Sequence, residues 1–107
     1  MNSSIVIALP KIDDAKKIRT ILNRHGFSVA AVCSTASTAL ASMSELDGGI
    51  LICGYKLTDR YYRDVLEDIP SYFEMLLLAS GRVIAEAPTS VLTVEMPMKV
   101  SDLVNTV

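Results

Sequence analysis

The strongest constraint on the fold is a set of five short apolar runs in which polar and apolar residues do not alternate. The central run, residues 50–54, is followed by an abrupt change to polar residues. A short, continuous apolar run bounded by turn residues is typical of a strand that is covered on both faces, as in a parallel sheet. The five runs predict strands at 5–9, 28–32, 50–54, 75–79 and 91–95.

Segments with helical periodicity lie between most of these strands. The first follows Asp13 and Asp14, which suit a first helical turn, and ends before Gly26, the expected left-handed residue. Its buried face is predicted to consist of Ala15, Ile18, Ile21, Leu22 and His25. Two further helices are predicted at 36–46, capped by the Ser34–Thr35 pair, and at 60–69.

Strands and helices that alternate over 107 residues predict a single α/β domain spanning residues 1–107. The expected architecture is flavodoxin-like: a doubly wound, parallel, five-stranded sheet of order 2-1-3-4-5. Residues 80–90 leave room for only a shortened fourth helix, at about 82–87. The fifth helix is truncated, because it ends on apolar Val107 after about two turns. This ending predicts a fragment of a longer chain; the alternative is a natural end with a frayed helix.

Composition and charge exclude several classes of function. A net charge of −2 provides no field that attracts a phosphate backbone. No apolar run is long enough to span a membrane, and no signal-peptide pattern precedes the first strand, so we expect a cytoplasmic protein. Cys33 and Cys53 are expected to be reduced, because the first strand would separate them by roughly 9–10 Å, beyond the ~7 Å limit for a disulfide.

The layout resembles the receiver domain of bacterial response regulators. The resemblance rests on the strand and Asp-rich helix at the start, on the third strand running into Leu57-Thr58-Asp59, and on residues 96–103. The family forms an acyl phosphate on an aspartate. The resemblance implies an acidic pair that holds Mg²⁺, an aspartate nucleophile, and a Ser or Thr and a Lys that bind phosphoryl oxygens.

The residues at the corresponding positions depart from that pattern. Leucine and proline stand for the acidic pair, glycine for the nucleophile, alanine or the following serine for the hydroxyl residue, and methionine for the lysine. These vestigial positions are Leu9, Pro10, Gly54, Ala79, Ser80 and Met96. We therefore predict a degenerate receiver that is not phosphorylated, with no catalytic residue, metal ligand or cofactor. Asp13, Asp14 and Asp59 are interpreted as solvated caps.

The departures resemble a narrower group, the degenerate receivers at the N-terminus of clostridial ANTAR-type transcription antiterminators. The resemblance rests on residues 7–11, 31–33, 52–55, 75–80 and 96–97. It implies a helical connection and an RNA-binding ANTAR domain after Val107, so RNA would be a partner only through that domain. It also implies a cis peptide between Met96 and Pro97.

Two functions remain open from the sequence. The first is a dimerisation or docking module that binds a second copy or a regulatory protein with Met96, Met98, Val100, Leu103, Val104 and Val107. The second is a small-molecule sensor that uses the emptied, apolar and shallow pocket at the strand ends. An enzyme is not expected, because no phosphate loop or nucleophile–base pair is present. Tyr55, Tyr61, Tyr62 and Tyr72 are interpreted as packing or rim residues, and His25 as a helix-terminal residue.

Overall fold

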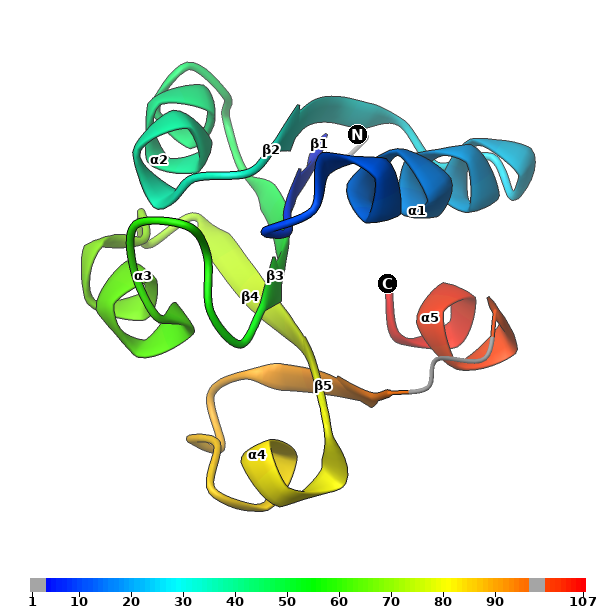
Figure 1. Ribbon diagram of the computed structural model, residues 1–107. Helices are drawn as coiled ribbons and strands as arrows, with labels where there is room; N and C mark the ends of the chain where they lie inside the picture. The colour runs from blue at the N-terminus through cyan, green and yellow to red at the C-terminus, as the bar shows by residue number, and fades with distance from the viewer. Residues whose placement is uncertain (1–3, 97–99) are drawn as a thin grey trace.

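The computed structural model describes residues 4–96 and 100–107, in which strands and helices alternate along the chain (Figure 1). The strands are β1 (Ser4–Ala8), β2 (Val29–Cys33), β3 (Gly49–Gly54), β4 (Phe73–Ala79) and β5 (Leu92–Glu95). The helices are α1 (Ile12–Arg24), α2 (Ala36–Ser44), α3 (Tyr62–Asp68), α4 (Gly81–Ala85) and α5 (Val100–Thr106).

The strands form one parallel sheet of order β2-β1-β3-β4-β5. This order confirms the flavodoxin-like architecture expected from the apolar runs. In the centre, Ile52 of β3 pairs with Ile7 of β1 on one side and with Leu76 of β4 on the other. The carboxyl ends of β1, β3, β4 and β5 therefore meet along one edge of the sheet.

Helices cover both faces of the sheet, which explains why the strands are apolar without alternation. Successive β3 residues belong to different sides: Leu51 and Cys53 pack in the core beneath α2, α3 and α4, whereas Ile52 packs in the core beneath α1 and α5. Figure 1 shows α2, α3 and α4 together on one side of the sheet and α1 with α5 on the other. Both faces are thus buried, as expected for a parallel sheet.

The ends of α1 follow the expected pattern with one correction. Gly26 has φ of +84°, the left-handed conformation that glycine adopts without steric cost. Ala15, Ile18 and Leu22 are buried as predicted. His25, which was placed on the buried face, is exposed, because it is the C-cap where the helical geometry ends.

The third helix is shorter than predicted at both ends. Residues 60 and 61 belong to a tight loop instead, in which the Leu57 N–H donates to the Arg60 carbonyl at 2.7 Å. Lys56 and Tyr61 form an isolated antiparallel bridge across this loop. At the other end, Ile69 is extended, with ψ of 136°, because the residue before a proline disfavours the helical conformation.

The C-terminal part agrees with the expected shortening. The α4 helix has only five residues and buries none of them, and α5 has seven. The structure corrects one interface residue here, since Leu103 is fully buried in the core between the sheet and α5. The predicted cis peptide at Met96–Pro97 lies outside the described residues.

Candidate functional site

Four of the vestigial positions come together at the carboxyl edge of the sheet. Leu9, Pro10, Gly54 and Met96 line a cavity of about 520 Å³. Leu78 and the α1 residues Ile18 and Ile21 supply further apolar wall, and the lining also contains Asp14, Lys17, Tyr55 and Lys56. The volume falls within the range of small-molecule sites. The cavity at the strand ends is mostly apolar, as the sequence predicted.

The other two vestigial positions lie elsewhere. Ala79 ends β4 and is buried in the core beneath α2, α3 and α4, so Leu78 takes its place in the cavity wall. Ser80 is exposed and is the N-cap of α4, where its side chain makes no capping hydrogen bond. The sequence register thus identified the right strand ends, and it was wrong only for β4, where Leu78 faces the cavity in place of Ala79 or Ser80.

Gly54 is packed against the residues that replace the acidic pair. A Cβ atom added at Gly54 would lie 3.1 Å from Cδ2 of Leu9 and 3.5 Å from Cδ of Pro10. Contacts of 3.1 Å are tighter than ordinary van der Waals separation. The end of β1 therefore occupies much of the space in which a side chain at position 54 would stand.

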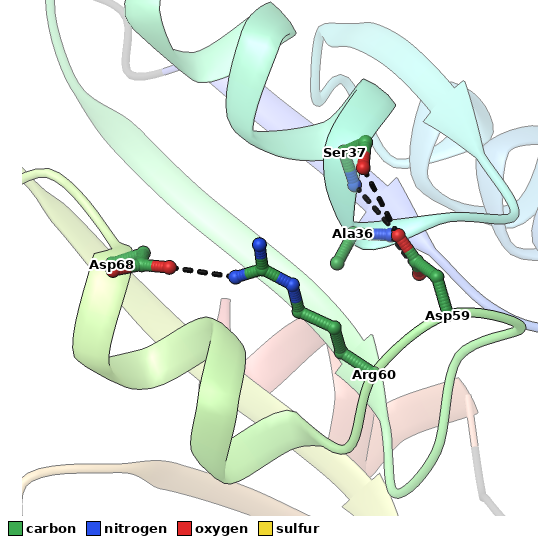
Figure 2. Close-up of polar contacts among 5 residues, drawn as sticks. All are labelled: Ala36, Ser37, Asp59, Arg60 and Asp68. Carbon is green, nitrogen blue, oxygen red and sulfur yellow. Dashed lines mark hydrogen bonds and ion pairs between the residues drawn. The ribbon is translucent and has the colours of Figure 1, made fainter.

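Asp59 has a structural role that is more specific than a solvated cap. Its carboxylate accepts hydrogen bonds from the Ala36 N–H at 2.6 Å, from the Ser37 N–H at 3.2 Å and from the Ser37 hydroxyl at 3.1 Å (Figure 2). It therefore caps α2, a helix that begins 23 residues earlier, and not a helix of its own segment. The backbone N–H of Ala36 is the main cause that lowers the pKa of the Asp59 carboxyl below its usual value.

The remaining donors at the start of α2 are also paired. Thr35 is the N-cap, as predicted, and its hydroxyl accepts from the Thr38 N–H at 3.2 Å. Thr58, next to Asp59, donates its hydroxyl and its N–H to the Ser34 carbonyl. The loop after β3 is thereby fastened to the loop before α2. An ion pair of 2.6 Å between Arg60 and Asp68 then joins the same loop to the end of α3 (Figure 2).

A second hollow, of about 410 Å³, lies between the loop after β3 and α4. It is lined by Tyr55, Tyr61, Tyr62, Arg63, Arg82, Val83 and Glu86. Tyr62 is buried, as a packing residue should be, whereas Tyr55 and Tyr61 are 47% and 45% exposed. Their rings meet edge to face with centroids 5.3 Å apart. This hollow was not predicted, although the basic residues Lys56, Arg60 and Arg63 interleave with the tyrosines in the sequence and were a usable signal.

Cys33 and Cys53 are both free and buried, as predicted, and they flank Ala8 on neighbouring strands. Burial raises the pKa of the Cys53 thiol to about 12.

Among residues 4–96 and 100–107, no three His, Cys, Asp or Glu side chains are arranged to hold a metal ion. Within the same ranges, none of the helices combines the length and apolarity needed to cross a membrane.

The predicted docking surface is only partly exposed. Met96 is 44% exposed and Val104 is half-buried. Val107 is also half-buried, because it packs on the core beneath α1 and α5. Leu103 is buried, and Met98 and the Val100 side chain lie outside the described part of the chain.

The sheet order and the alternating helices define the fold of response-regulator receiver domains. The anti-anti-sigma factor PhyR from Bartonella quintana superposes with a TM-score of 0.80 at 17% identity over 99% of this chain and 45% of that one. Chemotaxis response regulator CheY4 of Vibrio cholerae superposes with a TM-score of 0.81 at 13% identity, over 99% of this chain and 96% of that one. The receiver domain of an HD domain-containing protein from Pseudomonas fluorescens Pf-5 superposes with a TM-score of 0.81 at 15% identity, over 97% of this chain and 82% of that one.

These likenesses show the fold. The chain spans about half the length of the PhyR crystal structures from Bartonella and Brucella that it matches. No protein-family model matches the chain, and no curated protein matches it.

Proposed function

We propose that this chain is a receiver-like signalling module that works without phosphorylation and acts by binding a protein partner or a second copy of itself. The observation that carries the proposal is the packing of Leu9 and Pro10 over Gly54. These residues stand where the receiver pattern has its acidic pair and its nucleophile. Glycine has no side chain to phosphorylate, and leucine and proline offer no oxygen ligand for Mg²⁺.

The proposal includes the finer assignment drawn from the sequence resemblance. The chain would be the N-terminal part of a cytoplasmic regulator of transcription antitermination, with RNA bound by a C-terminal ANTAR domain. It involves no catalytic activity, metal or cofactor. The partner surface on the β5–α5 side is centred on Met96 and Val104, which retain exposed apolar surface.

A phosphotransfer assay tests the central claim. The protein is incubated with acetyl phosphate and Mg²⁺, and its intact mass is measured beside that of a receiver domain that carries the acidic pair and the aspartate. We expect no added phosphoryl group on this chain under conditions in which the control receiver is modified. A phosphorylated product in the same reaction would refute the proposal.

A second assay tests the partner surface. Light scattering of the protein should give a dimer, and Met96→Lys should weaken it. Tyr72→Ser is the matched control, because Tyr72 is an exposed apolar residue outside this surface. If both variants dimerise as strongly as the parent protein does, the assignment is contradicted.

A ligand sensor is the second candidate function, and the apolar cavity of about 520 Å³ favours it. Thermal-shift screening with nucleotides and metabolites distinguishes the two candidates. A compound that raises the melting temperature of the parent protein, but not that of Ile21→Lys, supports the sensor. Ile21 is suitable because it is half-buried in the cavity wall and not part of the fully buried core.

A further inference from the structure

The Tyr–Arg hollow, which we define as Tyr55, Tyr61, Arg63, Arg82 and Glu86 over buried Tyr62, is distinct from both sites considered above and shares only Tyr55 with the strand-end cavity. It is formed by the loop after β3, by α3 and by α4. Tyrosine and arginine are the residues most enriched at protein–protein interfaces and at their energetic hot spots. Three tyrosines and two arginines around one hollow are thus a composition typical of a protein-binding surface.

The loop that presents the tyrosines is held in place on several sides. Leu57 is buried at its tip, and the Tyr62 N–H donates to the Tyr55 carbonyl at 2.9 Å. Asp59 fastens the same loop to α2. The Tyr55 and Tyr61 rings are therefore positioned by the fold before any partner arrives, which reduces the entropy lost on binding.

The cations of the hollow are also positioned. The Arg63 guanidinium lies 5.8 Å from the Tyr62 ring centroid and donates to the Glu86 carbonyl at 2.8 Å. Lys56 Nζ lies 5.3 Å from the Tyr61 ring centroid at the edge of the hollow. Arg82 makes no ion pair within the described residues and is exposed. Glu86 contributes the one carboxylate in the lining.

We propose that the Tyr–Arg hollow is the docking site for an acidic protein segment with an aromatic or aliphatic side chain. Carboxylates of the segment pair with Arg82 and with Lys56, and its apolar side chain packs against the exposed surface of the Tyr55–Tyr61 ring pair. Charge complementarity favours this occupant, since the lining carries two cations and one anion on a chain whose net charge is −2, and Lys56 adds a cation against the Tyr61 ring. A nucleic acid is disfavoured, because strong binding to a phosphate backbone requires many more cationic contacts and the remaining surface is acidic.

This inference rests on the proposed partner-docking function but locates the contact on α3 and α4, away from Met96. It is tested with the whole chain and a fluorescein-labelled synthetic peptide of glutamate residues around one tryptophan. Fluorescence anisotropy is measured at low and at high salt. The control peptide carries glutamine in place of every glutamate, and a labelled oligouridylate is the nucleic-acid probe.

We expect the glutamate peptide to bind more tightly than the glutamine peptide, with an affinity that falls as salt rises. Arg82→Glu and Tyr61→Ala should each weaken binding by at least about tenfold. The matched controls are Lys16→Glu on α1, at the other face of the sheet, and the exposed Tyr72→Ala. Both controls should bind as the parent does.

Three results would overturn the inference. They are absence of glutamate-peptide binding, equal loss in the control variants, and preference for oligouridylate over the peptide. None of them bears on the phosphotransfer assay, so the two proposals fail separately. Circular dichroism of each variant confirms folding, and neither Arg82 nor Tyr61 is buried, so the loss of binding is attributable to the surface.

Discussion

Replacing Asp59 should destabilise the domain although its side chain is exposed. In the folded chain its carboxylate accepts hydrogen bonds from the first two backbone donors of α2, the N–H groups of Ala36 and Ser37. The third donor, the Thr38 N–H, donates to the Thr35 hydroxyl. Without Asp59, two donors lose their protein partner and the helix loses an anion at its positive end.

The size of the effect follows from these contacts. Loss of a capping side chain costs about 0.5–2 kcal/mol. Because Asp59→Ala also frees the loop from α2, we expect about 1–2 kcal/mol, or a fall of roughly 4–10 °C in melting temperature for a domain of this size. Asp59→Asn keeps one oxygen acceptor and should cost about half as much. Thr35→Ala, which removes the local cap, is the matched comparison.

Urea unfolding followed by circular dichroism gives the free energies. The cost of Asp59→Ala should shrink, but not vanish, in high salt, because screening weakens the charge and leaves the hydrogen bonds. A double-mutant cycle with Ser37→Ala should show coupling. If the free energy of unfolding of Asp59→Ala lies within about 0.3 kcal/mol of that of the parent, Asp59 does not stabilise α2 by capping it.

The pH dependence has a definite sign. The folded pKa of Asp59 is lowered, so its stabilising effect is complete above the ordinary aspartate pKa of about 3.9. It is lost as the pH falls from that value through the folded pKa. The difference between parent and Asp59→Asn should therefore be constant near neutral pH and decrease in that acidic range. A difference that grows on acidification would contradict the assignment.

Three further substitutions or reactions test the packing. Gly49→Ala should prevent folding, because φ at Gly49 is +156° and a Cβ there would overlap the Ser4 carbonyl oxygen; soluble expression measures this. Leu103→Ala should cost about 2–5 kcal/mol in urea unfolding if Leu103 is a core residue and not a surface contact. Cys53 should react with a thiol reagent at pH 8 only on unfolding, because burial raises its pKa to about 12.

The fold was predictable because its main signal is local. Each buried strand is a continuous apolar run, and the alternation of strands with helices in a right-handed parallel sheet leaves few strand orders. Boundaries were less accurate where long-range contacts decide them. The α3 helix starts late because Leu57 is drawn into the core, and β4 starts early because Phe73 pairs with Gly49 of β3.

The site was predictable only in part, for the same reason. Parallel topology brought Leu9, Gly54 and Met96 together as expected. The cavity wall also contains Ile18 and Ile21, which α1 contributes from another part of the chain. Asp59 could not be assigned to α2 from the sequence, since nothing local indicates a partner 23 residues away. Leu103 was misassigned because an apolar face in a short terminal helix is compatible with both a core and an interface.

The two candidate binding sites are physically connected through Tyr55. This residue lines both the strand-end cavity and the Tyr–Arg hollow, and it follows Gly54 directly. If both sites bind as proposed, a molecule in the cavity that fixes the Tyr55 ring would change the surface offered to an acidic segment, and the segment would change the cavity in return. Thermodynamic linkage makes the two effects equal in size. Under the proposed function, this coupling would form a signal path from the strand ends to the partner surface that needs no phosphoryl group. Equal peptide affinity with the cavity empty and occupied would exclude such a path.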